Sequence, residues 1–276
     1  MRTRGDDVLK SPPPAADGVA PSRQRLPPGA WATVLDFLTE RFPGVGEATW
    51  RSRMERGRVV DETGRALEAS APYRAGACVF YYREPPDEKQ IPFDEYVLYQ
   101  DEHLLVADKP HFLPVVPSGR YSRETLLARL RRAGHPAQLA PVHRLDRETA
   151  GLVLFSLDAS TRGLYASLFQ RREVEKVYEA LAPDAPALEF PLTRRSRVVR
   201  GEPFFRMKEA DGEPNSETRV EVVGSEGDAT RYRLRPVTGR KHQLRLHMSA
   251  LGIPIVNDRL YPEVCPPETD DFERPL

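Results

Sequence analysis

Residues 141–156 read Pro-Val-His-Arg-Leu-Asp-Arg-Glu-Thr-Ala-Gly-Leu-Val-Leu-Phe-Ser, a charged turn that passes directly into an apolar run. The run from Gly151 to Phe155 is rich in branched and aromatic residues, which predicts a buried strand. The turn places Asp146 between Arg144 and Arg147, and positive neighbours favour the ionised form of a carboxylate. Such a group suits nucleophilic or basic chemistry better than proton donation. By itself, the same pattern also fits a salt-bridged turn at the entrance to a buried strand.

The order of the remaining elements indicates the fold class. Strands and helices do not alternate as regular βαβ units, which favours an α+β fold with a mainly antiparallel sheet. Strand-like runs occur at residues 104–107, 151–157, 174–181, 218–223 and 231–236, and helical runs at 123–133, 160–171 and 242–251.

Two further motifs follow the Asp146 turn. Lys176–Ala180 reads Lys-Val-Tyr-Glu-Ala, and residues 236–247 contain Thr-Gly-Arg-Lys-His-Gln-Leu-Arg-Leu-His. The Asp146 turn and these two motifs make three motifs in a fixed order. Together with residues 251–261, they resemble the RluA family of RNA pseudouridine synthases. Only Ala150, where the family usually has Ser, departs from the first motif. The resemblance covers residues 101–261.

The resemblance implies a fold and a catalytic set. The fold would be a mixed, mainly antiparallel, bifurcated sheet with flanking helices. Asp146 would be the essential carboxylate, acting either as a nucleophile or as a base. Tyr178 would stack on the uracil and help to remove the C5 proton. Arg245 would pair with Asp146 and offset charge on the departing uracil. A glycosidase is an alternative, but it needs a second carboxylate beside Asp146, for which only Glu148 is a neighbour in sequence.

The resemblance also implies RNA contacts around this set. Arg144 would insert into the RNA near the flipped base, with Arg147 beside it. Arg240, Lys241 and His242 would bind phosphates. Large-subunit (23S) ribosomal RNA and tRNA are the family's bacterial substrates, so we expect one or both as the partner. The target base must leave its stack, at a cost of roughly a few kcal/mol.

The segment before residue 93 shows a different organisation. Residues 1–28 are rich in Pro, Ala, Gly and charge, which predicts a disordered tail. Residues 29–84 predict two short helices and a small sheet, an order that resembles the S4-type RNA-binding domain. Residues 85–92 read as a linker, and 93–276 as the catalytic domain. The predicted phosphate contacts of the S4-like domain are Arg51, Arg53, Arg56 and Arg58.

Composition sets the broad class. The chain has 276 residues, of which 39% are hydrophobic and 30% charged, values typical of a globular protein. No apolar run approaches the length of a membrane span, and the basic N-terminus has no apolar core of a signal peptide. Cys78 and Cys265 read as free thiols. We therefore expect a cytoplasmic monomer without membrane association.

The charges are segregated along a chain of zero formal net charge. Basic residues gather in 120–147, 194–208 and 231–245, whereas acidic residues gather in 87–108 and 263–273. Such segregation predicts a positive face that could bind RNA. Local pairing of each run on a solvated surface is the alternative.

Two expectations complete the sequence reading. The reaction needs no redox cofactor or metal, and the sequence has no Gly-rich phosphate loop or zinc-ligand spacing, so no cofactor is expected. Family members usually continue past the last motif with strands that return to the sheet, whereas this sequence ends in a Pro-rich acidic stretch. A non-catalytic RNA-binding or ribosome-associated protein is therefore the alternative function.

Overall fold

The computed structural model describes residues 13–83, 88–265 and 272. These residues form two compact units. One contains Met1–Gln90 and Val116–Leu139, and the other contains Ile91–Val115 and Ala140–Leu276. The expected contiguous catalytic domain from residue 93 onward is therefore interrupted, because residues 116–139 group with the N-terminal unit.

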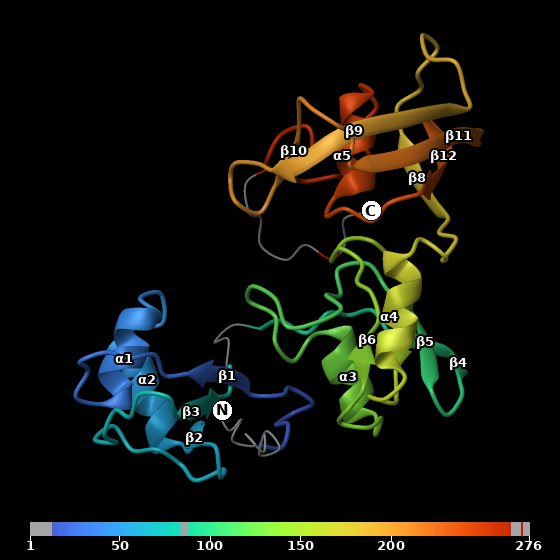
Figure 1. Ribbon diagram of the computed structural model, residues 1–276. Helices are drawn as coiled ribbons and strands as arrows, with labels where there is room; N and C mark the ends of the chain where they lie inside the picture. The colour runs from blue at the N-terminus through green and yellow to red at the C-terminus, as the bar shows by residue number, and fades with distance from the viewer. Residues whose placement is uncertain (1–12, 84–87, 266–271, 273–276) are drawn as a thin grey trace, which may run out of the picture. The chain divides into compact units, whose positions relative to one another are not determined.

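The first unit is a small α+β body (Figure 1). Its antiparallel sheet has the strand order β1-β3-β2, and every element is short. A capping box between Thr33 and Asp36 starts the first helix. The core gathers around Trp50, which is fully buried. The elements are β1 (Ser22–Arg25), α1 (Val34–Arg41), α2 (Glu47–Glu55), β2 (Val59–Asp61), β3 (Cys78–Tyr81) and α3 (Leu126–Arg132).

Two boundary predictions for this unit are wrong. Residues 1–28 were expected to be disordered, but Ser22–Arg25 forms β1 because its backbone pairs with β3 along the whole strand. Residues 85–92 were expected to be a free linker. Residues 85–87 lie outside the described part, but the Glu88 carboxylate accepts hydrogen bonds from the backbone amides of Ser122 and Glu124, each at 2.6 Å. Ile91 is 1% exposed.

The second unit contains two antiparallel sheets. One has five strands in the order β10-β9-β11-β12-β8, and the other has four in the order β4-β5-β7-β6. The strands are β4 (Tyr96–Gln100), β5 (Leu104–Lys109), β6 (Ala140–Pro141), β7 (Gly151–Ser156), β8 (Tyr178–Ala182), β9 (Leu192–Arg200), β10 (Met207–Ala210), β11 (Ser216–Glu226) and β12 (Ala229–Pro236). The helices are α4 (Arg162–Gln170) and α5 (Gln243–Ala250).

The α+β class is confirmed, and every strand pair among the described residues is antiparallel. The strands of this unit are divided between the five-stranded and the four-stranded sheet. Within the described part of the chain, no ladder joins a strand of the five-stranded sheet to a strand of the four-stranded one. The site described below draws its side chains from both sheets of this unit.

Helix α5 covers one face of the five-stranded sheet. Met248 is fully buried and clusters with Tyr232 and Leu234 of β12. Alternation along β12 explains this face, because every second residue of the strand is buried. The packing fixes the position of α5, and with it the direction of Arg245.

No helix in the described part of the chain has the length and apolar character needed to cross a bilayer.

Gly18 packs close to α3 in the first unit and has a positive φ of 75°. A Cβ atom there would lie 2.3 Å from the carbonyl oxygen of Ala128, whereas one on Gly76, with φ 88°, would meet nothing within 4 Å. Gly76→Ala should therefore cost only the left-handed strain, about 1 kcal/mol of unfolding free energy. Gly18→Ala should cost clearly more, measured by urea unfolding. Equal losses would show that the N-terminal segment does not pack on α3.

Candidate active site

Asp146 lies in the turn that precedes β7. The turn closes through a hydrogen bond from the Thr149 amide to the Asp146 carbonyl at 3.1 Å. On its N-terminal side, Val142 donates to the Leu154 carbonyl, and the Leu154 amide donates to His143 Nε2 at 3.2 Å. The ends of the turn are thereby attached to β7, while the carboxylate of Asp146 stays one-third exposed.

Lys109, the last residue of β5, forms a hydrogen bond to the backbone of this turn. Its side chain is fully buried, and Nζ donates to the carbonyls of Pro110 at 2.9 Å and Arg147 at 3.1 Å. Burial lowers the pKa of the Lys109 ammonium to about 7, against the opposing effect of the Asp146 carboxylate. A buried ammonium needs such partners, and its hydrogen bond to the Arg147 carbonyl ties the Asp146 turn to β5.

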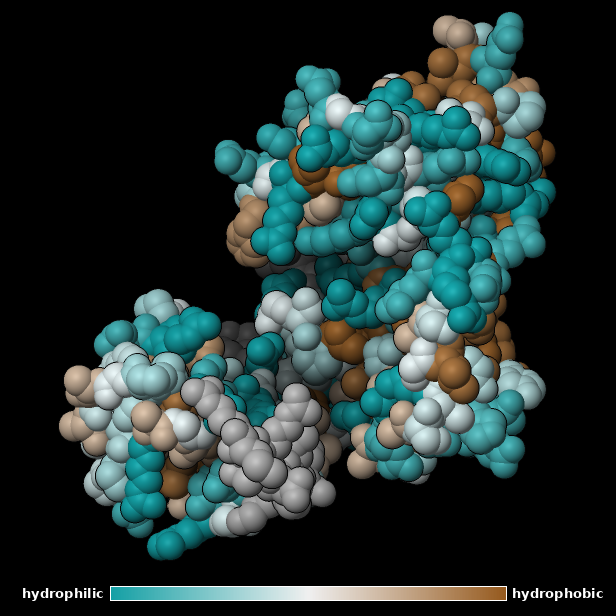
Figure 2. Space-filling view, viewed as in Figure 1, coloured by the Kyte–Doolittle hydropathy of each residue, from teal (hydrophilic) through white to brown (hydrophobic). Residues whose placement is uncertain are grey.

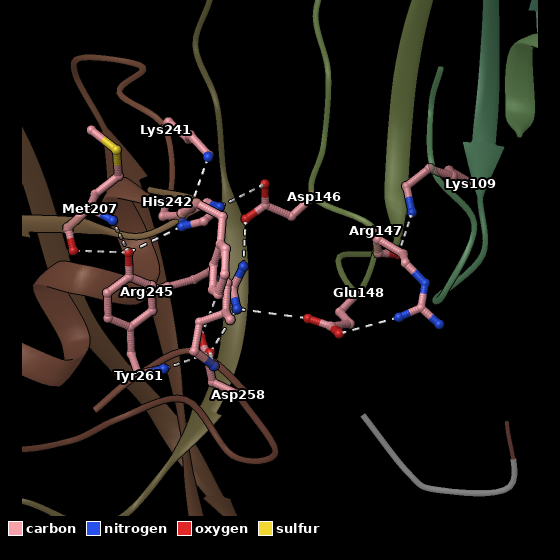
Figure 3. Close-up of polar contacts among 12 residues, drawn as sticks. Lys109, Asp146, Arg147, Glu148, Met207, Lys241, His242, Arg245, Asp258 and Tyr261 are labelled. Atoms are coloured by element: carbon pink, nitrogen blue, oxygen red, sulfur yellow. Dashed lines mark hydrogen bonds and ion pairs between the residues drawn. The ribbon is translucent and has the colours of Figure 1, made fainter. Parts of the chain in front are cut away.

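Arg245 connects α5 to the Asp146 turn (Figure 3). Its Nη1 donates to Asp146 Oδ2 at 2.9 Å, and its other two nitrogens bind both oxygens of Asp258 at 2.6 and 2.7 Å. Burial alone would lower the pKa of Arg245, but its hydrogen bonds and charge interactions with Asp258 and Asp146 raise it above the ordinary value. The guanidinium is therefore permanently charged and fixed in direction.

Glu148 is a second carboxylate beside Arg245. One of its oxygens lies 3.7 Å from Arg245 Nη2, and the other lies 3.6 Å from Arg147 Nη1. The Arg147 guanidinium also lies over the ring of Phe112, at 5.6 Å from its centroid. Arg147 thus has partners inside the protein, whereas an RNA contact was predicted for it.

His242 begins α5 in the left-handed conformation, with φ 54°. Its side chain is only 7% exposed, with Nε2 at 3.9 Å from Asp146 Oδ1 and Nδ1 hydrogen-bonded to the Tyr261 hydroxyl at 3.1 Å. Burial lowers the pKa of His242 to about 4. A phosphate contact was predicted for His242, whose imidazole is largely buried, neutral at pH 7 and close to a carboxylate.

Tyr178 is the first residue of β8 and pairs with Leu234 of β12. Burial, and secondly the charge of Asp146, raises the pKa of its phenol. The structure thus brings Tyr178 into the electrostatic range of Asp146 and keeps the phenol protonated at neutral pH.

The Thr-Gly-Arg-Lys-His-Gln segment is a tight turn fixed by buried amide and hydroxyl groups. Gln243 Oε1 accepts from the Thr238 hydroxyl at 2.7 Å and from the Arg240 amide at 3.0 Å. Arg240 and Lys241 are exposed and donate only to carbonyl oxygens, those of Asn215 and Phe205. Neither forms an ion pair with a described residue, so their positive charges remain available to a phosphate.

A buried polar network under α5 holds the helix on the sheet. His247 is fully buried, with Nε2 at 3.0 Å from the hydroxyls of both Ser196 and Ser216, and Nδ1 at 2.9 Å from Thr218 Oγ1. Burial lowers the pKa of His247 to about 4, so the ring is neutral. The last His of the motif is therefore structural, since its polar atoms are all occupied inside the protein.

The other predicted RNA contacts differ in exposure. Arg144 is exposed and forms no side-chain hydrogen bond or ion pair within the described residues, consistent with a role outside the protein. In the first unit, Arg51 and Arg56 are exposed, and Arg58 is partly buried. Arg53 is 8% exposed, with its guanidinium 5.0 Å from the ring centroid of Trp50. Burial leaves the guanidinium of Arg53 little access to a phosphate, although such a contact was predicted for it.

The expected positive face is largely neutralised on the five-stranded sheet. Figure 2 shows predominantly hydrophilic side chains over β9 and β12. Their arginines form an arginine–glutamate ladder: Arg194–Glu209, Arg195–Glu217, Arg231–Glu179, Arg231–Glu226, Arg233–Glu179, Arg235–Glu175 and Arg235–Glu221. The acids come from neighbouring strands and turns, which a reading of charge along the sequence cannot detect.

Sequence reasoning assigned no role to three residues that complete the site. Asp258 binds Arg245, and Tyr261 binds His242 and the backbone of Met207 at 2.8 Å. Both lie in residues 251–261, the segment that follows the third motif, so their spacing could have indicated a role. Lys109 gave no such signal, because only the structure shows that its ammonium is buried.

Chemically, the arrangement offers one partly exposed carboxylate, a fixed guanidinium and a neutral phenol. No group of three or more His, Cys, Asp or Glu side chains among the described residues is placed to bind a metal ion. The set can attack or deprotonate a carbon centre and stabilise negative charge that develops beside it.

Comparison with known proteins identifies the class. The family model described as RNA pseudouridylate synthase matches residues 103–250, which include the Asp146 turn, Tyr178 and Arg245. The chain belongs to this family and is an RNA pseudouridine synthase, an isomerase acting on RNA.

Individual relatives agree with this assignment. The dual-specificity RNA pseudouridine synthase RluA of Vibrio cholerae is 36% identical over 194 residues, covering 68% of this chain and 74% of the relative. An uncharacterized RNA pseudouridine synthase of Synechocystis is 28% identical over 234 residues, covering 83% of this chain and 79% of the relative. The solved structure of human RNA pseudouridylate synthase domain containing 1 aligns with a TM-score of 0.54 at 28% identity, covering 64% of this chain and 73% of the human one.

Asp258→Asn should reduce kcat on the order of 100-fold, because a misdirected Arg245 no longer meets Asp146 in the required geometry. Removing one partner of this buried pair should also cost about 3 kcal/mol of unfolding free energy. Glu226→Gln, which removes the exposed partner of Arg231, is the matched control and should change neither quantity appreciably. An unchanged kcat in Asp258→Asn would show that the Asp258 pair does not position Arg245.

Proposed function

We propose that Asp146 is the essential carboxylate, with Arg245 and Tyr178 as its partners, and that the chain modifies uridines in structured RNA. The observation that carries the proposal is the Asp146–Arg245 hydrogen bond, which joins two distant sequence motifs at 2.9 Å. The carboxylate is also one-third exposed, so a substrate can reach it.

The chemistry to be assigned is an isomerisation in which atoms balance within the substrate. The bond between N1 and C1′ breaks, the uracil turns, a bond from C5 to C1′ forms, and C5 loses its proton while N1 gains one. Asp146 would either attack the substrate or act as a base at the sugar. The fixed charge of Arg245 would stabilise negative charge on the detached uracil.

Tyr178 would contact the flipped uracil. A protonated phenol supports stacking directly. To remove the C5 proton, however, it would first have to give up its own proton, and its raised pKa opposes this. Stacking is therefore the role that the electrostatics favour, with proton removal as the second candidate.

Several finer features belong to the same proposal. The RNA would be 23S ribosomal RNA, tRNA or both, bound by Arg144, Arg240 and Lys241 around the site. The first unit would act as an S4-like RNA-binding domain through Arg51, Arg56 and Arg58. The protein would work as a cytoplasmic monomer.

A non-catalytic RNA-binding or ribosome-associated role is the competing function. This role would not explain why a partly exposed carboxylate, Asp146, is held by Arg245, because RNA binding alone does not need a carboxylate that faces the substrate. Assays of turnover with variants of these residues separate the two functions.

Asp146→Asn should abolish turnover and leave RNA affinity largely intact, because the substitution keeps the shape of the side chain and removes its charge. Release of tritium from RNA labelled at C5 of uridine measures turnover, and filter binding measures affinity. Asp228→Asn, an exposed carboxylate in the β11–β12 turn, is the control. Turnover of Asp146→Asn within tenfold of the wild type would show that another group is essential.

The target RNA can be identified by mapping pseudouridines in total RNA from cells with and without this protein, and from cells that carry Asp146→Asn. We expect discrete sites in 23S ribosomal RNA or tRNA to disappear in both mutant samples. Sites found only in other RNA classes would overturn the proposed substrate, while sites that persist with Asp146→Asn would overturn the proposed catalytic residue.

A further inference from the structure

The loop between β9 and β10, residues 201–206, carries an aromatic side chain that the catalytic set does not use. Phe204 is 85% exposed, the largest value among the exposed large hydrophobic residues of the described chain. Its one aromatic neighbour within the described part is Phe205, at 5.5 Å between ring centroids in an edge-on arrangement. One whole face of a large apolar ring therefore remains in contact with water.

The loop has a defined backbone rather than an open one. Gly201 donates to the carbonyl of Arg206 at 3.0 Å, and Arg206 donates to that of Pro203 at 2.8 Å. The Arg206 guanidinium lies over the ring of Tyr261 at 4.9 Å and donates to the Pro262 carbonyl at 2.6 Å. Phe204 is thus presented from a fixed support.

A series of polar contacts links the loop to Asp146. Lys241 Nζ donates to the Phe205 carbonyl at 2.8 Å. From the base of the loop, Met207 donates to the Tyr261 hydroxyl, which binds His242, whose Nε2 lies 3.9 Å from Asp146 (Figure 3). The exposed ring and the reacting centre therefore belong to one connected assembly.

The charges around the loop indicate what covers Phe204. Lys241 and Arg240 are exposed without an ion-pair partner among the described residues, and Arg200 and Lys208 are exposed at the ends of β9 and β10 that flank the loop. An apolar ring among cations matches a nucleic-acid strand, whose phosphates pair with the cations while a base stacks on the ring. A purely apolar protein partner would leave these cations desolvated and unpaired.

We propose that Phe204 is a base-stacking residue that holds an unpaired nucleotide of the substrate RNA near the flipped uridine. The inference rests on the proposed RNA substrate and adds a specific contact to it. Stacking contributes affinity with little base selectivity, because every base has a π face. Phe204 would therefore help to fix the position of the strand, while other contacts determine which uridine enters the site.

The test measures binding directly and so does not depend on turnover. Phe204→Ala should raise the Kd for a short RNA stem-loop with an unpaired uridine-rich loop about 5- to 100-fold, the range expected for losing one stacked base. Tyr96→Ala, which removes an aromatic ring that is 64% exposed on β4, is the matched control and should leave Kd unchanged. Phe204→Tyr should restore most of the affinity.

A second variant gives a readout that a merely structural role would not change. In Phe204→Trp, the new indole should be quenched when the stem-loop is added, beyond any change of Trp31 and Trp50 in the wild type. A Kd for Phe204→Ala within twofold of the wild type would overturn the proposal. So would the absence of an RNA-dependent signal in Phe204→Trp, or an equal loss of affinity in Tyr96→Ala. None of these results bears on whether Asp146→Asn abolishes turnover. The proposal for Phe204 and the proposed function can therefore fail separately.

Discussion

The position of Arg245 between two carboxylates is the interaction on which the site depends. Asp258 binds the guanidinium through both oxygens, and Asp146 takes the remaining donor. Asp258 is nearly fully buried and Asp146 is partly exposed, so the first carboxylate fixes the arginine while the second remains accessible to substrate. The α5 helix that carries Arg245 is in turn fixed by His247, whose ring is hydrogen-bonded on both sides. The geometry of the Asp146–Arg245 pair is therefore set by groups that are buried inside the protein.

Much of this site was predictable from sequence, and the reasons for the rest are physical. Asp146, Tyr178 and Arg245 could be named because each sits in a motif with a characteristic order of residue types. The structure brings Arg245 to Asp146, and the charge of Asp146 reaches Tyr178. His242 carries the same kind of signal, but its burial decides its role, and burial depends on Tyr261 and α5, which lie later in the chain. The burial of Arg53 was not predicted for the same reason, since nothing local indicates that its guanidinium lies over the Trp50 ring.

The strands were also predicted only where the local sequence carries the signal. Runs with clear apolar periodicity, such as β7 and β12, were predicted close to their observed bounds. Strand β9 was missed, because Leu192–Arg200 is rich in arginine, lacks a regular apolar alternation and reads as a basic surface run. Strand β1 was missed because its stability comes from pairing with β3, which lies far away in sequence: Ser22 pairs with Tyr81 and Arg25 with Cys78. Tertiary pairing of this kind overrides local composition.

The arginine–glutamate ladder on the five-stranded sheet has a thermodynamic consequence for RNA binding. Phosphates gain affinity from a protein chiefly by releasing condensed counterions when free cations replace them. Cations that already have carboxylate partners must exchange one anion for another, so they contribute little to this release. The paired arginines of this sheet therefore add little attraction toward polyanions. That attraction falls instead to exposed cations that form no ion pair among the described residues, such as Arg144, Arg240 and Lys241.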